Sequence, residues 1–304
     1  MIELVRIRDL DITDIAGRRA FVSAASGLVR IRACIHVIAD DELHLASFDL
    51  DNPGPGRLLR LFKGELPRAG PDRKKRKPDL EALCLLPRMA GALYGALLAI
   101  GSGSRPNRRR GALILLDANG SAVQSNLVDL APLFSPLSDE FEEINVEGAV
   151  VAGDDLLLFQ RGSGSDPDNA IIAYPLATAL EATSLRDGKA LEPRIRHIGL
   201  GTIGQAPLSF TDAAAVPGIG IVFSAVAEDT ANAYDDGSLR AAAIGLLDMD
   251  GNLLHVETIV PPVKVEGIDA RLDGDLIRLT MVTDADDPTV PASLYSTAIK
   301  ALVA

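Results

Sequence analysis

A phrase of two short strands recurs five times along the chain, and this repeat constrains the fold more than any other feature. Its clearest copy lies at 144–162, where Glu147 opens an apolar run, a turn follows at 153–155, and a second apolar run ends at Gln160 and Arg161. Neighbouring copies are 54 to 66 residues apart, counted between the anchor residues Ser26, Glu81, Glu147, Asp212 and Glu266. Counted through the chain ends, the interval from the last anchor to the first is 64 residues, which indicates a closed ring of similar units.

Within each unit, Gly, Asn and Asp turns such as 117–120 and 249–252 separate short apolar runs, which is a hairpin signal. Four short strands in about 60 residues are typical of a propeller blade. The sequence therefore predicts an all-β fold, a single β-propeller domain over residues 1–304 with five four-stranded blades. The expected blade starts lie near residues 20, 79, 144, 209 and 263. A six-bladed propeller and a pair of β-sandwiches are the alternatives.

The fifth unit reaches its third strand at 293–300, and the chain then ends. Residues 1–12 alternate apolar and polar side chains, so we expect them to complete the last blade and close the ring. Such closure also covers two sheet edges that otherwise invite aggregation. Short helical turns are expected at 130–141 and 175–182, and the charged segment 68–78 is expected to be an exposed loop.

The net charge of −12 and the pI near 4.8 argue against nucleic acid as a partner of the whole surface. No apolar window reaches the ~18 residues of a membrane span, and the N-terminus has the pattern of a strand and not of a signal peptide. Cys34 and Cys84 lie in apolar runs and are expected to be buried, reduced thiols. We therefore expect a cytoplasmic monomer that binds neither nucleic acid nor membrane.

The order of strands in a meander predicts where the candidate functional side chains lie. The first strand of a blade starts on the same face of the ring on which the second strand ends, and the innermost strands line the central channel. Anchors and strand ends should therefore meet round one channel mouth. The candidate ligand-binding residues at this mouth are Glu81, Arg105, Glu147, Arg161, Asp212, Glu228, Glu266 and Asp284.

Carboxylates that converge on one axis repel one another strongly and must be balanced. A divalent ion, most naturally Ca²⁺, suits a loose ring of oxygen ligands. The alternative is that Arg105, Arg161 and Lys264 pair with the acids across neighbouring blades. The residue types are compatible with both.

Charge is also uneven on this face. Basic residues gather at 73–77 and 105–110, and acidic residues gather at 228–236 and 284–287. A basic rim beside an acidic one can hold an anionic ligand, although two solvated loops of opposite sign give the same pattern.

Several phrases together resemble an uncharacterised bacterial β-propeller family of unknown function. They are 145–148 with 160–162, the run 101–106, and 210–214 with 227–230. A Glu-Gly pair that opens an inner strand is also distantly similar to phytase-like esterase and gluconolactonase-type propellers. In the gluconolactonase type such a Glu is a ligand of a divalent ion, so the resemblance implies Glu147 and Glu266 as metal ligands.

Two functions remain open. The first is a binding module that takes a small anionic molecule or a protein partner at the channel mouth. The second is a divalent-metal-dependent hydrolase of a phosphoester or lactone, with Glu81 or Asp212 as the base and Arg105 and Arg161 as an anion clamp. The sequence assigns no catalytic residue firmly.

Overall fold

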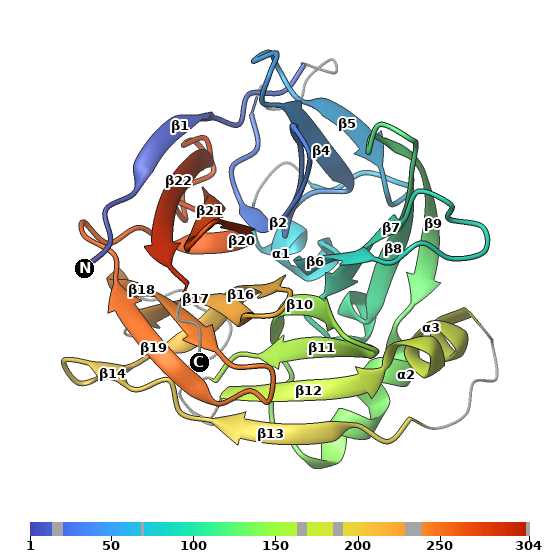
Figure 1. Cartoon of the computed structure of the whole chain (residues 1–304). Helices are drawn as coiled ribbons and strands as arrows, with labels where there is room; N and C mark the ends of the chain where they lie inside the picture. The colour runs from blue at the N-terminus through green and yellow to red at the C-terminus, as the bar shows by residue number, and fades with distance from the viewer. Residues whose placement is uncertain (14–20, 68–69, 163–168, 185–190, 229–238, 302–304) are drawn as a thin grey trace.

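Five four-stranded antiparallel sheets stand side by side in a ring in the computed structural model (Figure 1). The structure describes residues 1–13, 21–67, 70–162, 169–184, 191–228 and 239–301. The strands of the first three blades are β2 (Ala25–Ile31), β3 (Cys34–Ala39), β4 (His44–Asp49) and β5 (Arg57–Arg60); β6 (Leu80–Leu86), β7 (Ala96–Gly101), β8 (Arg110–Leu116) and β9 (Ala122–Asp129); and β10 (Val146–Ala152), β11 (Asp155–Gln160), β12 (Asn169–Pro175) and β13 (Arg194–Ile198).

The remaining strands complete blades four and five. They are β16 (Ser209–Val216), β17 (Gly220–Glu228), β18 (Leu239–Leu247) and β19 (Leu253–Thr258), then β20 (Val265–Asp273), β21 (Leu276–Thr283), β22 (Ser293–Lys300) and β1 (Val5–Asp9). A small hairpin, β14 (Thr202–Ile203) and β15 (Ala206–Pro207), precedes blade four. The predicted five-bladed propeller is confirmed.

The N-terminal strand closes the ring as predicted. β1 pairs antiparallel with β22, with Val5 opposite Ser296 and Asp9 opposite Ser293. The sheet order of the last blade is therefore β20, β21, β22, β1, and its outermost strand comes from the other end of the chain. Because this strand hydrogen bonds along the edge of β22, the two ends of the chain are joined within one sheet.

Every innermost strand carries the same irregularity near its start. The pairing register shifts between Ala25 and Gly27 in β2, and the same shift recurs at the matching place in β6, β10, β16 and β20. The extra residues at these five bulges are Ser26, Glu81, Glu147, Thr211 and Glu266. The anchor in blade four is therefore Thr211, and the sequence alignment on Asp212 was displaced by one residue.

The residue after each bulge is small in four blades because the inner strands approach one another closely there. A Cβ on Gly148 would lie 3.0 Å from the Ala213 nitrogen of the next blade. A Cβ on Gly267 would lie 2.9 Å from the Gly27 carbonyl carbon and 2.9 Å from the Leu28 nitrogen. The Gly of the repeated phrase thus permits backbone to approach backbone around the channel.

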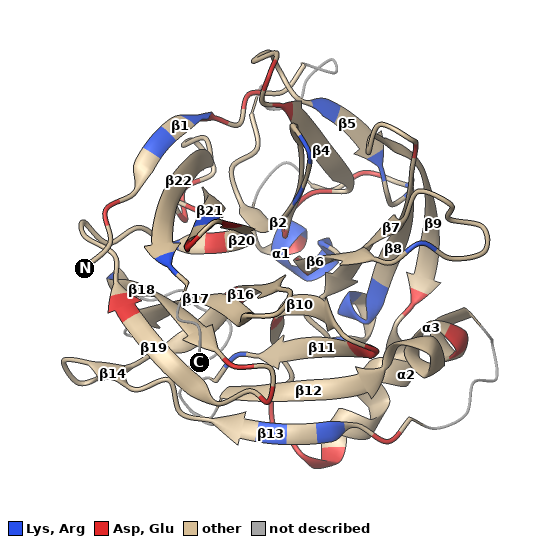
Figure 2. Ribbon diagram, viewed as in Figure 1, with Lys and Arg blue, Asp and Glu red and all other residues tan. Residues whose placement is uncertain are grey.

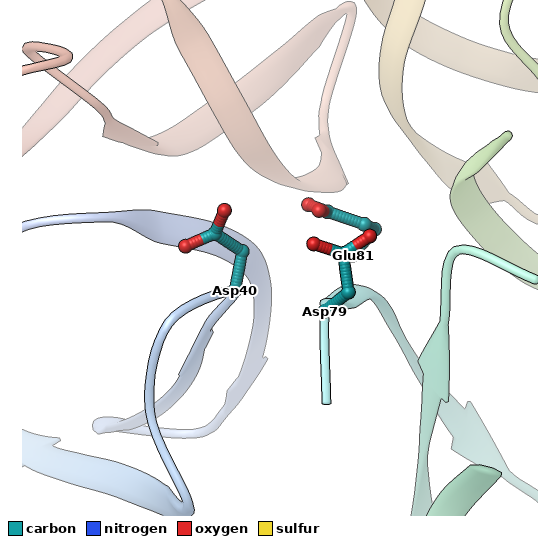
Figure 3. A group of neighbouring side chains, drawn as sticks. All are labelled: Asp40, Asp79 and Glu81. Carbon is teal, nitrogen blue, oxygen red and sulfur yellow. The ribbon is translucent and has the colours of Figure 1, made fainter. Parts of the chain in front are cut away.

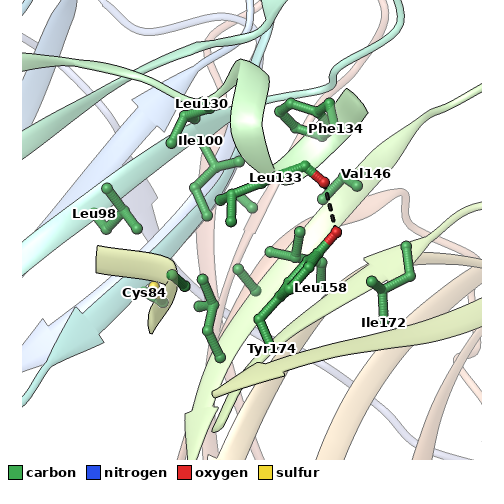
Figure 4. Packing of buried hydrophobic residues seen from close by; sticks show 14 of the residues in the cluster. Cys84, Leu98, Ile100, Leu130, Leu133, Phe134, Val146, Leu158, Ile172 and Tyr174 are labelled. Atoms are coloured by element: carbon green, nitrogen blue, oxygen red, sulfur yellow. Dashed lines mark hydrogen bonds between the residues drawn. The ribbon is translucent and has the colours of Figure 1, made fainter. Parts of the chain in front are cut away.

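Apolar side chains fill the spaces between blades, and the largest cluster lies between blades two and three (Figure 4). The helices α2 (Ala131–Phe134) and α3 (Leu176–Ser184) contribute to it, as does η2 (Ser135–Asp139). The buried Tyr174 hydroxyl donates to the Leu133 carbonyl at 2.6 Å, which satisfies its one polar group. α2 and η2 lie within the segment 130–141 where helical turns were expected, and α3 overlaps the segment 175–182 and continues to Ser184.

One expectation about segment 68–78 was wrong. Residues Pro71–Arg76 form the helix α1, which the structure places next to the turn η1 (Pro106–Arg108). The Asn107 amide donates to the Lys75 carbonyl at 3.2 Å and to the Lys77 carbonyl at 3.3 Å. Pro71 at the helix start and this contact explain a helix in a segment that reads as a loop.

Gly267→Ala should destabilise the fold by about 1–3 kcal/mol, because the added methyl group meets backbone that has no room to move. Chemical denaturation monitored by circular dichroism measures the change. Gly199→Ala is the matched control, since nothing lies within 4 Å of a Cβ there. Equal stability of the two variants would contradict the close approach of inner strands.

Candidate functional site

Acidic side chains converge on one mouth of the channel because the bulges and the ends of the second strands lie on the same face. Val146 pairs with Gln160 at the end of β11, and Val265 pairs with Thr283 at the end of β21. Burial raises the pKa of Glu81 well above its usual range, and the nearby Asp79 and Glu147 raise it further. Burial also raises the pKa of Glu266, and Glu147 adds to that effect while Lys264 opposes it.

Arg161 joins two of these acids across blades. Its Nη1 lies 3.4 Å from Glu147 Oε1, and its Nη2 lies 2.7 Å from Glu228 Oε2. Asn145 also donates to Glu147 Oε1, at 2.6 Å. Three residues of the expected site are therefore in direct contact, and an arginine balances two of its carboxylates.

Lys264 supplies the neighbouring charge. Its Nζ lies 3.2 Å from Glu266 Oε1, 2.9 Å from Asp286 Oδ1 and 3.6 Å from Glu228 Oε1. The Lys264 side chain is only 6% exposed, so these ion pairs are poorly screened by water. Blades three, four and five are thus connected by a network of alternating charge.

A second network lies between blades one and two and was largely missed from the sequence. Asp79 accepts a hydrogen bond from the Ser102 hydroxyl at 2.6 Å, and its Oδ2 lies 2.7 Å from Arg108 Nη1. Lys77 Nζ lies 2.9 Å from Asp79 Oδ1 and also pairs with Asp40. The signal for Asp79 was its place two residues before the anchor Glu81.

Asp40, Asp79 and Glu81 each offer a carboxylate oxygen within 4.8 Å of the others (Figure 3). Burial raises the pKa of Asp40 to about 6, while Lys77 opposes the shift. Among the described residues this trio is the group of acids close enough to share one ion, and Glu147 and Glu266 do not belong to it.

Two anchors carry hydroxyl groups in place of carboxylates and bind the next blade. The Ser26 hydroxyl donates to the Leu80 carbonyl at 2.5 Å, and the Thr211 hydroxyl donates to the Val265 carbonyl at 2.5 Å. In both cases the acceptor is the residue just before the next anchor. These two positions are therefore structural links between blades.

Asp212 occupies the position that Gly or Ala takes in the other blades. Its Oδ2 accepts the Ile268 backbone N–H at 2.8 Å, and its Oδ1 has no partner among the described residues. The residue is 1% exposed, and burial raises its pKa well above the usual range. It lies one residue further along β16 from the mouth than the anchor Thr211 and faces blade five.

The remaining expected site residues lie at the rim. Burial, followed by the nearby Asp286, raises the pKa of Asp284 to about 7. Arg105 lies just before η1 and is half-buried, whereas Arg108 makes the ion pair with Asp79. The acidic residues Asp229, Asp235 and Asp236 lie outside the described residues.

A family model of unknown function, DUF6929, matches residues 21–299. The chain belongs to the DUF6929 family. No curated protein matches this DUF6929 chain. Within its described residues, no helix is long and apolar enough to cross a membrane.

Solved structures with similar folds include a luciferin-regenerating enzyme, at 10% identity with a TM-score of 0.48, covering 91% of each chain. The Cps50 (Swd1) β-propeller domain of Myceliophteria thermophila matches at 13% identity with a TM-score of 0.40, covering 90% of this chain and 96% of that one. A chain of a nidogen/laminin complex matches at 10% identity with a TM-score of 0.45, covering 99% and 98%.

Asp284→Asn should stabilise the DUF6929 protein more at pH 8 than at pH 5. The folded-state pKa of about 7 lies above the unfolded value, so the ionised side chain costs stability that is absent at low pH. The cost grows as pH rises from about 4 to 7, by up to about 1.4 kcal/mol per pH unit. Urea denaturation at several pH values measures it.

Asp287→Asn is the control for that titration, because Asp287 is exposed and Thr289 lowers its pKa. Its substitution should bring no gain that rises with pH. A pH-independent difference between wild type and Asp284→Asn would show that Asp284 does not titrate in this range.

Proposed function

We propose that the channel-mouth face binds an acidic segment of a partner protein across a basic rim formed by α1 and η1. One observation carries the proposal: nine of the 30 Lys and Arg residues lie in 73–77 and 105–110, in a chain whose net charge is −12. Such a concentration of cations on an acidic protein favours an anionic partner at that place.

Some basic residues of the rim pair with nearby acids, and others are exposed. Arg73 pairs with Asp41 at 3.0 Å and Glu42 at 2.8 Å, while Lys77 and Arg108 serve the acidic network. The exposed basic residues of the rim are Lys74, Lys75, Arg76 and Arg110. Figure 2 shows the basic colouring of α1, which lies near the centre of the ring in this view.

The shape of the rim favours an extended partner over a small anion. Six residues of α-helix span about 9 Å, so the charges of α1 and the adjacent η1 are spread further than one phosphate or carboxylate reaches. A run of Asp or Glu residues presents several carboxylates at such spacings. The acids of the channel mouth lie beside this track and repel an anion that moves off it.

The double variant Lys75→Glu/Arg76→Glu should bind a fluorescent octaglutamate peptide about tenfold more weakly than the wild type, because two attractive charges become repulsive. Fluorescence anisotropy at low salt measures the affinity. Arg278→Glu/Lys300→Glu on the exposed outer part of blade five is the matched control and should change binding less than twofold.

Equal losses in both double variants would contradict a local site and indicate a response to net charge. Full competition by inorganic pyrophosphate at the affinity of the peptide would assign the rim to a small anion. Tighter binding of a DNA duplex than of the peptide would assign it to nucleic acid. Each of these results overturns the proposal.

The metal-dependent hydrolase of a phosphoester or lactone is the second candidate, and its support is the trio Asp40, Asp79 and Glu81. Their oxygens fit the spacing of a Ca²⁺ site, and the resemblance to phytase-like and gluconolactonase-type propellers implies such an ion. Lys77 contacts two members of the trio, so the ion would have to displace it. When bound, Ca²⁺ would polarise a substrate oxygen.

If the trio holds Ca²⁺, then about 1 mM CaCl₂ should raise the melting temperature by several degrees, and EDTA should reverse the shift. Glu81→Gln should abolish it, because one anionic ligand is lost. The control Glu192→Gln changes an exposed acid and should leave the shift intact. An unchanged melting curve with Ca²⁺ would exclude this candidate.

Under this proposal the protein is a cytoplasmic monomer. Both cysteines are free, with Cys84 buried in β6 and Cys34 half-buried in β3, which supports a reducing compartment. A monomer leaves the rim open to a partner of different sequence.

A further inference from the structure

A cavity of about 280 Å³ lies in the channel beyond the bulges, away from the acidic mouth. All five inner strands contribute to its wall, with apolar side chains such as Leu28, Leu83, Ala149 and Ile268. Arg30, Asp269 and Arg271 add charge to the same wall. None of these charged residues takes part in the network at the mouth.

Two charged residues of β20, Asp269 and Arg271, break the repeat. Counted from the bulge, Asp269 corresponds to Val29, Cys84, Val150 and Ala214 in the other blades. Arg271 corresponds to Ile31, Leu86, Ala152 and Val216. Apolar residues suffice for packing at both places in four blades, and burying the carboxylate of Asp269 costs free energy that packing does not require. Packing therefore does not explain the two charged residues in the fifth blade.

The charged residues form a built cluster between blades five and one. Asp269 Oδ2 accepts a hydrogen bond from Arg271 Nε at 3.0 Å, and Asp269 Oδ1 accepts the Arg30 backbone N–H at 2.9 Å. Arg271 also donates through Nη2 to the Arg30 carbonyl. The Asp269 side chain is 14% exposed and the Arg271 side chain is 41% exposed, so the carboxylate is the buried member of the pair and the guanidinium is open to solvent.

Both guanidinium groups keep unused donors. Arg30 donates through Nε to the Arg32 carbonyl at 2.8 Å, and among the described residues its two terminal nitrogens have no acceptor. Arg271 Nη1 likewise has none in that part of the chain. Two arginines and one aspartate give the site a net positive charge of one, which complements a monoanion.

We infer that this cavity binds a small carboxylate with an apolar body, its carboxylate on Arg30 and Arg271 and its body against the inner strands. Arginine pairs with carboxylates through parallel N–H donors. The volume corresponds to about nine water molecules, which admits a molecule of the size of benzoate. The other side chains that line the cavity are apolar, so they give no partner for a second charge.

Benzoate is the probe, and isothermal titration of the full chain measures its binding. Arg30→Ala should weaken binding about tenfold or more, whereas it leaves the Asp269–Arg271 pair and the Arg30 backbone contact in place. Arg194→Ala is the control, since it removes a paired arginine of the outermost strand of blade three, which lies outside the cavity. Melting curves establish that both variants fold.

Absence of benzoate binding at 10 mM would overturn the inference, as would unchanged affinity in folded Arg30→Ala. If inorganic phosphate binds as tightly as benzoate, the apolar wall does not contribute to binding, and this result would also overturn the inference. These outcomes do not depend on the basic rim, so the proposal for the mouth stands or falls separately.

Discussion

The structure depends on the close approach of five strand edges around one axis. The bulge near the start of each inner strand is the device that allows it, since it leaves one residue unpaired and directs that residue toward the mouth. In four of the five blades the next residue is small, and the contacts of Gly148 and Gly267 show how little room there is. The geometry that closes the ring therefore also brings the side chains of the five bulge residues together at the channel mouth.

Three of the five bulges carry glutamate. The carboxylates repel one another, and cations elsewhere at the mouth balance their charge. Arg161 lies between Glu147 and Glu228, and Lys264 contacts both Glu228 and Glu266. Lys77 does the same for Asp40 and Asp79 of blades one and two, and Arg108 pairs with Asp79. Because Arg161, Lys264 and Lys77 are each shared between acids of different blades, the networks tie the blades together. Burial raises the pKa of Asp40 and Glu266 even though each has a cationic partner.

The sequence was sufficient for the architecture because the repeat spacing and the strand order are long-range properties that one-residue errors do not disturb. An error of one residue does, however, change which side chains are assigned to a site. Asp212 was aligned with Glu147, but the bulge lies at Thr211, so Asp212 turns toward blade five instead of joining the mouth. The pairing of Arg161 with Glu147 followed from the meander, whereas that of Arg108 with Asp79 depends on a turn whose path no periodicity encodes. Similarly, α1 forms where contact with η1 holds it.

Residues that depart from the repeat tell more about function than residues that follow it. Comparison of equivalent positions in the five blades shows which residue types packing alone requires. Leu, Val and Ala form the channel wall in most blades, so packing of the core does not explain why Asp269 and Arg271 are charged. Asp212 is a further departure, since a carboxylate with one unpartnered oxygen replaces a hydrogen atom or methyl group. It lies between the mouth and the cavity, next to Ala213 in the cavity wall. The mouth and the cavity are thus two chemically distinct ends of one channel, and a ligand at either end meets a different set of charges.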